Sequence, residues 1–532
     1  MQDCSEFKLG QRVHSSGDPR RIGTVRYVGP VQGYSGKWVG VDWYNGEGKH
    51  DGSINGVRYF QAKSEKSGSF VRTQNLSPGI SLLEALEIRY RGYSTKEEED
   101  EMYVLSASNK RVSVQFVGKD KIQDKLSRFE ELTSASLSYM AVSSPGLPCH
   151  ISTTIPNVKE LDLTGNLLSD WKDVGTICGQ LPALATLNLS NNVMSQCISG
   201  LPTLKSIRVL VLNYTGIDWE QVDVLKLSLP AIEELHLLGN NISRIMTSSS
   251  VVQGLDSLRV LNLEDNCIAE WDEIIKLSQL RCLEQLHLNK NSLNCIFYPD
   301  SGMHEYSTFE SGATFYKPFQ NLRCLLLGGN NIDNLASVDS INSFPNLVDI
   351  RLSENPIADP GRGGIPRFVL VARLGKIQML NGSEVSPRER KDSEIRYVRH
   401  IMTRLHANPE EIKQLHPRFL ELKNFYGIED ERPSSGTAGQ QKMGSGLLSI
   451  TLKCVAASIG EKAPLTKKLP ATTTVGKLKF LCESFFKLKS IKPKLFLQEE
   501  SSPLPILLDD EMASLIDLGI GNGSTILVDE ES

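Results

Sequence analysis

The sequence predicts a multidomain protein in which a small all-β barrel is followed by an α/β solenoid and then by a C-terminal α+β domain. Residues 1–79 hold 13 of the 42 glycines between short β-rich runs, residues 151–430 contain a repeated leucine pattern, and residues 447–532 alternate strand-like and helix-like runs. At 532 residues the chain is too long for one hydrophobic core, which also favours several domains.

Composition places the chain among soluble globular proteins. Hydrophobic residues make up 40% and charged residues 23%, close to the globular average. The start lacks a basic segment followed by an apolar one, and no run of about 18 apolar residues occurs, so we expect neither secretion nor membrane spanning. The ten cysteines form no CxxC pair, which favours a reduced, cytoplasmic chain.

The first 79 residues predict a strongly bent β-barrel, because the runs "RIGTVRYVG", "KWVGVDW" and "VRYF" are separated by glycines. Residues 1–76 contain 11 Lys and Arg against 7 Asp and Glu, a net charge of +4, which leaves −9 for the rest of the chain. This basic region suggests an acidic partner, although such a charge is also ordinary for a small domain.

Residues 80–150 predict a connector and an N-terminal cap for the solenoid. The runs "MYVLSAS" and "RVSVQFVG" indicate two strands, and "DKIQDKLSRFEELTSASL" indicates a helix because its apolar residues lie three and four apart.

The region 151–430 repeats the pattern L-x-x-L-x-L-x-x-N-x-L eight times, which is typical of a leucine-rich-repeat solenoid. The spacings between second anchors are 26, 23, 25, 26, 25, 39 and 25 residues, so one repeat carries an insertion, in or near residues 295–318. These anchors are Leu161, Leu187, Leu210, Leu235, Leu261, Leu286, Leu325 and Ile350.

An asparagine in most repeats is expected to hydrogen-bond the backbone of the neighbouring turn, which a stacked solenoid would otherwise bury unpaired. Thr215 takes this place in the third repeat. Leu374, Ile377, Leu380 and Tyr397 are expected to cover the last repeat, and residues 431–446 have the composition of a flexible linker. The asparagines are Asn166, Asn192, Asn240, Asn266, Asn291, Asn330 and Asn355.

Residues 447–532 resemble the ubiquitin fold. The expected order is strand, strand, a helix after Thr474, strand, a short turn and a last strand, and the closing "LIDLGIGNGSTIL" carries the resemblance. The chain ends in "DEES" without a terminal Gly-Gly, so we expect a ubiquitin-like domain that cannot be conjugated.

The glycine-rich loop "GEGKHDG" at residues 46–52 raises the question of a phosphate or metal site. No G-x-x-x-x-G-K-[ST], G-x-S-x-G or H-E-x-x-H occurs in the sequence. His236 and His287 fall two strands apart, roughly 10 Å, which is too far for one zinc ion. We therefore expect no metal, no cofactor and no enzyme.

The solenoid register places a mixed set of side chains on its concave face, without the converging groups that catalysis needs. This face is expected to bind protein. In the alternative interpretation these residues are only solvated, and partners use an edge or a loop. The candidate contacts are Asp162, Asn188, Val211, His236, Asn262, His287, Leu326 and Arg351.

Residues 8–76 resemble the CAP-Gly domain through "GTVRYVG", "GKWVGVDW", "GEGKHDGSINGVRYF" and "GSFVR", with His50 where the family signature has Asn. The resemblance implies a groove for acidic C-terminal tails that end in an aromatic carboxylate, such as that of α-tubulin. It assigns charge to Lys49 and Arg72, and groove walls to Trp38, Phe70 and, less directly, Tyr34.

Three further residues of this motif complete the expected site. His50 and glycine amides, including that of Gly52, would donate hydrogen bonds to the peptide, while Asp51 would fix the loop. Because an imidazole takes up a proton below its reference pKa of about 6.5, tail binding is expected to strengthen on acidification.

The three domains in this order resemble the tubulin-folding cofactor E family over nearly the whole chain. The resemblance implies a cytoplasmic, cytoskeleton-associated chaperone that binds α-tubulin and acts with cofactors D and C and β-tubulin, without nucleic acid, membrane or small-molecule substrate. Two alternatives are a CAP-Gly protein that binds the microtubule lattice and a ubiquitin-pathway adaptor. The absence of sustained heptads disfavours the first.

Overall fold

A computed structural model of the chain forms two compact units, residues 1–294 with 299–330 and residues 295–298 with 331–532. None of the helices in the described ranges combines the length and apolarity needed to cross a bilayer. The structure describes residues 7–91, 103–105, 111–113, 125–147, 149–246, 252–299, 317–359, 363–404, 410, 414–428, 447–456, 462–488, 492–498, 505–508, 511, 514–515, 518, 520–521 and 523–530.

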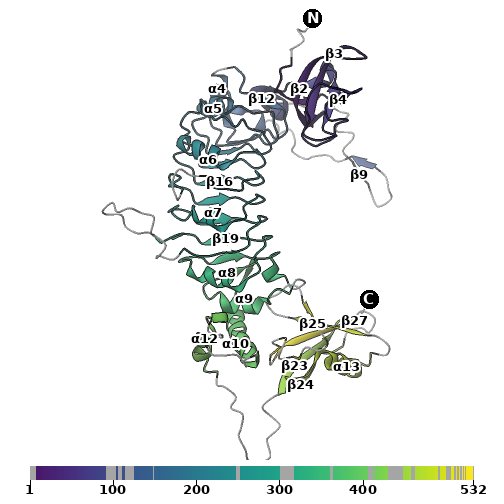
Figure 1. The fold of residues 1–532 in the computed structure, drawn as a ribbon, viewed down its shortest axis with the longest axis vertical. Helices are drawn as coiled ribbons and strands as arrows, with labels where there is room; N and C mark the ends of the chain where they lie inside the picture. The colour runs from purple at the N-terminus through teal and green to yellow at the C-terminus, as the bar shows by residue number, and fades with distance from the viewer. Residues whose placement is uncertain are drawn as a thin grey trace, which may run out of the picture. The chain divides into compact units, whose positions relative to one another are not determined.

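The N-terminal barrel is a five-stranded sheet in the order β6-β3-β2-β1-β7, drawn in purple in Figure 1. Its core contains Val13, Val25, Val39, Val41 and Trp43, all at most 2% exposed. The elements are β1 (Arg12–Ser15), β2 (Asp18–Val31), β3 (Tyr34–Trp43), the small hairpin β4 (Ser53–Ile54) and β5 (Val57–Arg58), β6 (Gly68–Val71), η1 (Thr73–Asn75) and β7 (Leu76–Ser77).

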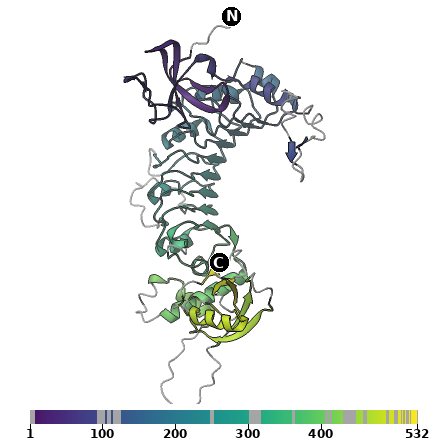
Figure 2. The ribbon, with the colours of Figure 1, turned by 90° about the vertical axis from the view of Figure 1, so that its right-hand side faces the viewer.

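The barrel packs against the first repeats, beside which it lies in Figure 2. Arg12 is 5% exposed, and its Nη1 donates to the carbonyl oxygen of Leu168 at 2.7 Å. Ile22 is buried together with Ala141 and Leu167 in a small apolar cluster. The barrel is therefore fixed to the array by both apolar packing and a buried hydrogen bond.

The connector differs in part from its prediction. The two expected strands, β9 and β10, form and pair with each other. Residues 125–126 of the predicted helix are helical, but the chain then forms a turn, a 3₁₀ helix and a strand. The rest of that helix lies outside the described residues. The elements are β8 (Ile80–Ser81), α1 (Leu82–Leu86), the π-helix η2 (Glu87–Arg91), β9 (Tyr103–Leu105), β10 (Arg111–Ser113), η3 (Phe129–Glu131), β11 (Ser134–Ser136), β12 (Val142–Ser144) and α4 (His150–Thr154).

Strand β11 shows why the predicted helix does not continue to its expected end. The residues "LTSASLSYM" carry a degenerate leucine-rich repeat in which Ala135 replaces the central leucine and Met140 replaces the asparagine. Ala135 pairs with Leu161 in a parallel ladder and is 1% exposed. Tertiary stacking on the next repeat thus overrides the local helical pattern.

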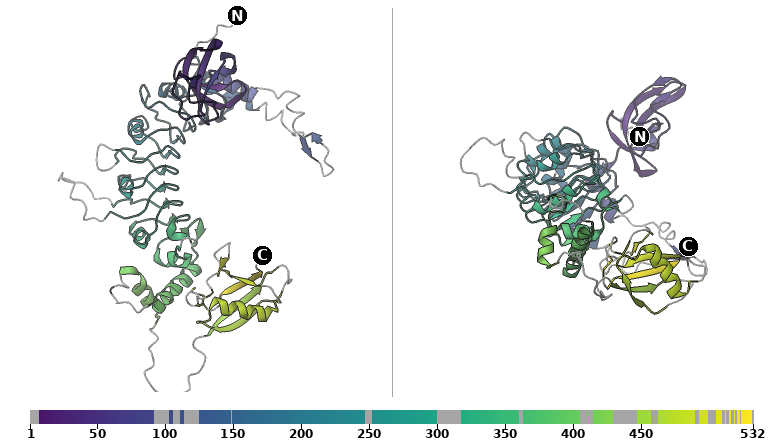
Figure 3. Two further views of the ribbon diagram at one scale, coloured as in Figure 1. Left: turned by 45° about the vertical axis from the view of Figure 1, so that its right-hand side comes forward. Right: turned by 60° about the horizontal axis from the view of Figure 1, so that its bottom comes forward.

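The repeats of the first unit form a parallel ladder in which each anchor leucine is opposite the next. The anchors from Leu161 to Leu325 are at most 3% exposed. The left panel of Figure 3 shows the strands along one side of the array and the helices along the other. The strands are β13 (Glu160–Asp162), β14 (Thr186–Asn188), β15 (Val209–Val211), β16 (Glu234–His236), β17 (Val260–Asn262), β18 (Gln285–His287) and β19 (Cys324–Leu326).

Three helices of the array begin with a buried tryptophan: Trp171 in α5, Trp219 in α6 and Trp271 in α7, all at most 2% exposed. Asp170 and Asp218 cap the first two of these helices through their carboxylates. Each tryptophan thereby fills the space between strand and helix layers, a role that the leucine pattern alone does not reveal. The elements are α5 (Trp171–Gly179), α6 (Trp219–Leu225), η4 (Lys226–Ser228) and α7 (Trp271–Ile275).

The predicted asparagine ladder is confirmed. Asn266 donates to the carbonyl oxygens of Leu237 and Leu263, both at 3.0 Å. Its Oδ1 accepts from the amides of Asn240 at 3.0 Å and Ile242 at 2.9 Å. One side chain thus satisfies two carbonyls and two amides that the stacked repeats bury.

The second unit begins with the last repeat and its cap. Leu374, Ile377, Leu380 and Tyr397 are at most 2% exposed, which confirms their predicted covering role. The elements are α8 (Leu335–Ser340), η5 (Ile341–Ser343), β20 (Asp349–Arg351), η6 (Pro356–Ala358), α9 (Arg367–Arg373), β21 (Met379–Leu380), β22 (Ser383–Glu384), α10 (Pro387–Arg404) and α12 (Phe419–Phe425).

The C-terminal domain has the predicted ubiquitin-like order, with a sheet β24-β23-β27-β25-β26 and one helix. Strands β23 and β27 are parallel neighbours at its centre, and Val475, Leu478 and Cys482 of the helix are fully buried. The predicted linker lies outside the described residues. The elements are β23 (Leu447–Cys454), β24 (Leu465–Pro470), α13 (Val475–Phe486), β25 (Pro493–Gln498), β26 (Ile506–Leu507) and β27 (Thr525–Glu530).

The ladder predicts the effect of Asn266→Ala. The substitution leaves buried carbonyl and amide groups unpaired, so we expect a loss of stability of about 1–3 kcal/mol. The measurement is the shift of the unfolding transition in far-ultraviolet circular dichroism. The control is Gln285→Ala on the exposed side of β18, which should change stability by less than about 0.5 kcal/mol. Equal shifts for the two variants would contradict the role of the ladder.

Candidate functional site

The first candidate site is one face of the barrel sheet, where β2, β3 and β6 present two adjacent rows of residues. In one row Tyr27 and Phe70 both pair with Gly40. Residues two apart on a strand share a face, so Trp38 begins the next row. Arg72 lies over the Trp38 ring, with its guanidinium carbon 3.7 Å from the ring centroid. The face therefore combines aromatic surface with a cation.

The position of Arg72 is fixed from several directions. Its Nη1 donates to the backbone oxygen of Lys37 at 3.4 Å. Gly36 has φ +80°, and a Cβ there would lie 2.8 Å from Arg72 Nη1. Tyr34 is 50% exposed, with its ring centroid 6.0 Å from that of Trp38. A guanidinium held in this way can pair with a carboxylate without a large loss of side-chain freedom.

Phe70 lies at the centre of an aromatic cluster. The centroids of Tyr27, Tyr59, Phe60 and His50 are 5.9, 5.3, 5.5 and 5.1 Å from that of Phe70. All but His50 meet it edge to face, the favoured arrangement of aromatic pairs. The motif predicts Phe70 at the site but not Tyr27, Tyr59 or Phe60, because the sequence gives no sign that residues so far apart in the chain are in contact.

The loop that follows β3 anchors itself through Asp51, as predicted. Its carboxylate accepts from the Ser53 amide at 3.0 Å and pairs with Arg58 at 2.7 Å. The Ser53 hydrogen bond, with the Arg58 charge in support, lowers the pKa of Asp51. The Lys49 amide donates to the Gly68 oxygen at 2.6 Å, which ties the loop to β6 and leaves the Lys49 side chain exposed.

His50 is held as a neutral imidazole. Its Nδ1 accepts from the Gly52 amide at 3.0 Å, and its ring stacks on Phe70 at an interplanar angle of 30°. Burial lowers the pKa of His50, against the opposing Asp51 charge and with the support of Lys49. The prediction that His50 takes up a proton just below pH 6.5 is therefore corrected, because its lowered pKa moves protonation to lower pH. The neutral ring can still donate a hydrogen bond to a ligand from Nε2, since Nδ1 is the acceptor.

Gly52 shapes the loop instead of donating to a ligand, since its amide is already bonded to His50. This corrects the expected role of the Gly52 amide. Gly52 has φ +99°, and a Cβ there would lie 2.0 Å from the Phe60 carbonyl oxygen. Only glycine permits the loop to approach Phe60 this closely.

The strand face of the array is the second candidate site. The register places Asp162, Asn188, Val211, His236, Asn262, His287 and Leu326 in one row across neighbouring strands. Arg351 holds the same place in β20 of the second unit, where its Nε donates to Ser353 Oγ at 2.9 Å.

Part of this row is engaged in the array's own turns. Asp162 accepts from the Thr164 amide at 3.0 Å, and Asn188 accepts from the Ser190 amide at 3.0 Å. Asn262 accepts from the Glu264 amide at 2.9 Å. These three side-chain oxygens therefore stabilise the turns that follow their strands, whether or not they also bind a partner.

The two histidines lie two strands apart, as predicted, with Asn262 between them. Within the described residues, no three His, Cys, Asp or Glu side chains gather as a metal site requires. His236 lies 3.5 Å from Glu234 on the same strand.

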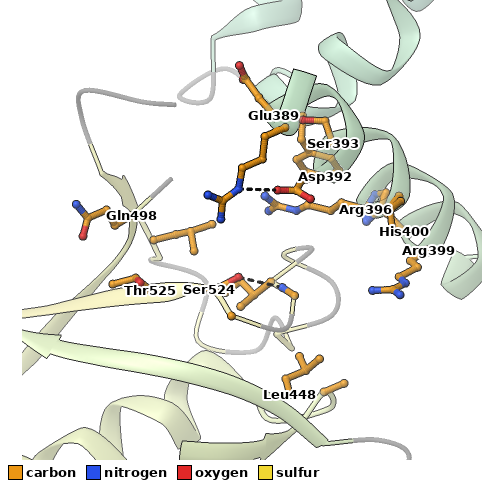
Figure 4. Close-up of a pocket in the computed structure, with 18 of the residues that line it drawn as sticks. Glu389, Asp392, Ser393, Arg396, Arg399, His400, Leu448, Gln498, Ser524 and Thr525 are labelled. Carbon is orange, nitrogen blue, oxygen red and sulfur yellow. Dashed lines mark hydrogen bonds and ion pairs between the residues drawn. The ribbon is translucent and has the colours of Figure 1, made fainter. Parts of the chain in front are cut away.

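A cavity of about 570 Å³ in the second unit lies between α10 and the ubiquitin-like domain (Figure 4). Two of its acidic side chains have basic partners: Arg388 lies 3.8 Å from Asp392, and Glu389 pairs with Arg367 at 2.7 Å. On the other side, Ser524 Oγ accepts from the Gly521 amide at 3.2 Å.

The geometry defines a class: a multidomain CAP-Gly protein with a leucine-rich-repeat array and a ubiquitin-like domain. The family model of the CAP-Gly domain matches residues 9–76. Tubulin-folding cofactor E of Arabidopsis thaliana is 65% identical over 528 residues, covering 99% of this chain and 98% of that protein. Tubulin-specific chaperone E is 33% identical in Danio rerio and 30% identical in Homo sapiens, with 98% of each chain covered. The chain therefore belongs to the tubulin-folding cofactor E family.

The environment of His50 predicts its titration. In a proton NMR titration of the full chain, the His50 resonance should have a midpoint below 6.5, because folding favours the neutral ring. The associated stability is fully present above pH 6.5 and is lost as the pH falls through the folded-state pKa. The His50→Asn variant identifies the resonance. A midpoint at or above 6.5 would contradict this description of the site.

Proposed function

We propose that this chain is a cytoplasmic tubulin chaperone that captures α-tubulin at two places. The barrel groove binds the acidic C-terminal tail, and the strand face of the array binds the folded body. The observation that carries the proposal is the Arg72 guanidinium held on Trp38. Lys49 adds a second, exposed cation in the loop that is bonded to Gly68 of β6. A tail with carboxylates and a terminal aromatic ring matches this combination in charge and shape.

The relatives' printed names support tubulin as the partner. With cofactors D and C and β-tubulin, the captured subunit would enter or leave the α/β heterodimer. The chain contributes binding energy and no chemistry in this proposal. Once the tail is held, the second contact benefits from a high effective concentration.

Lys49→Ala and Arg72→Ala should each weaken tail binding by about 1–3 kcal/mol, the scale for losing a charged hydrogen-bond partner. Higher salt should weaken binding as well. The measurement is calorimetric titration of the full chain with a synthetic tail peptide. The control is Lys66→Ala, an exposed cation of the same domain. If Lys66→Ala has the same effect as Lys49→Ala, only the overall charge of the barrel matters and the proposed groove is wrong.

The body contact is tested with tubulin from which the acidic tails have been removed by protease. Val211→Arg on the strand face should weaken binding of this tubulin about tenfold or more, since a charge then meets a desolvated interface. Val224→Arg on α6, where the valine is 47% exposed, is the matched control. Equal affinities of the two variants would exclude the strand face. Preferential binding to polymer over soluble tubulin would favour a lattice-binding protein instead.

A further inference from the structure

Two tyrosines occupy the same position in two repeats of the first unit. Tyr139 follows β11 and Tyr214 follows β15, each three residues after the strand ends, and their φ angles are +57° and +54°. Each ring lies on a glycine of the next repeat. A Cβ on Gly165 or Gly239 would lie 2.1 Å from the Cε1 of the respective tyrosine.

This arrangement is unfavourable for an isolated chain. Bulky residues rarely adopt positive φ, and the equivalent positions in neighbouring repeats are occupied by Asn191, Asp265 and Lys290. Backbone strain of this kind is typical of binding surfaces. The array thus holds each ring flat, with one face against a glycine.

The first ring shows what the other face can bind. The guanidinium carbon of Arg20, on β2 of the barrel, lies 5.7 Å from the Tyr139 ring centroid. This distance is within the range of a cation–π contact. The Tyr139 ring, packed on Gly165, therefore already binds an arginine side chain within the first unit.

The second ring has the same backing but an open face. Tyr214 is 49% exposed, against 36% for Tyr139, and among the described residues no Lys or Arg lies over it. Its hydroxyl donates to Asp265 Oδ2 at 3.1 Å, so a carboxylate adjoins the ring edge. The ring and the carboxylate together offer the two features that a guanidinium uses, a flat π surface and an anion.

We propose that Tyr214, Gly239 and Asp265 form a socket for an arginine side chain on the folded body of the captured subunit. The identity of that subunit as tubulin rests on the proposed function. The acidic tail is excluded as the occupant by charge, because Asp265 and its neighbour Glu264 would repel it. The barrel and the array thus bind opposite charges of one partner.

The experiment uses the full chain and tubulin without its acidic tails. Tyr214→Asn replaces the ring by a residue that tolerates positive φ, as Asn191 does at the equivalent position. Asp265→Asn keeps the shape and removes the charge. Each should weaken binding about tenfold, whereas Tyr214→Phe, which keeps the ring and loses only the hydroxyl bond, should have a smaller effect. Leu227→Ala, 76% exposed on the helix side, is the control.

A chemical footprint identifies the bound group. Arginines of the tubulin are modified with phenylglyoxal in complexes with the wild-type chain and with Tyr214→Asn, and mapped by mass spectrometry. One arginine should be protected only in the wild-type complex. Wild-type affinity of both Tyr214→Asn and Asp265→Asn, or weaker binding without a differentially protected arginine, would overturn the socket. Failure of the wild-type chain to bind tail-less tubulin would instead overturn the proposed body contact, and the assignment of the socket's partner with it.

Discussion

The burial of peptide groups between stacked repeats is the constraint on which the array depends. Each turn after a strand places carbonyls and amides where water cannot reach them, and a side-chain amide with two donors and two acceptor sites resolves this in a single residue. Asn266 bonds the turns of two repeats at once. This bonding fixes the register of the strands, and the register in turn aligns the outward side chains in rows. The strand face of the array, the proposed surface for the folded body, is a consequence of the same ladder.

In the barrel, the constraint is the placement of a cation and of aromatic side chains on one exposed face of the sheet. Arg72 rests on Trp38, and His50 is kept neutral between Phe70 and the Gly52 amide. A neutral imidazole leaves Lys49 and Arg72 as the cations of the groove and provides an Nε2 donor. Preorganisation lowers the entropy that binding costs, which supports the proposal that this face binds an acidic tail.

The repeats, the barrel and the ubiquitin-like domain could be predicted from the sequence because their signals are periodic or local. The anchors that end at Leu325, the covering role of Tyr397 and the loop role of Asp51 all follow from spacing or motif. Strand β11 could not be predicted, since Ala135 and Met140 break the pattern and only stacking on the next repeat defines the strand. The lowered pKa of His50 could not be predicted either, because it depends on burial, which the sequence motif does not show.

The attachment of the barrel to the array determines the distance between the two proposed binding surfaces, the barrel face and the strand face. Arg12 is buried at this junction and donates to Leu168, while Arg20 covers Tyr139 on the same side. Moving the barrel would expose the apolar cluster around Ile22 and leave a buried guanidinium without its acceptor, which is costly. The barrel face and the strand face of the first unit are therefore held at a fixed separation. A flexible tail can span such a separation, whereas two rigid epitopes would have to match it. This is the reason why we assign a mobile tail to the first proposed contact and a folded body to the second.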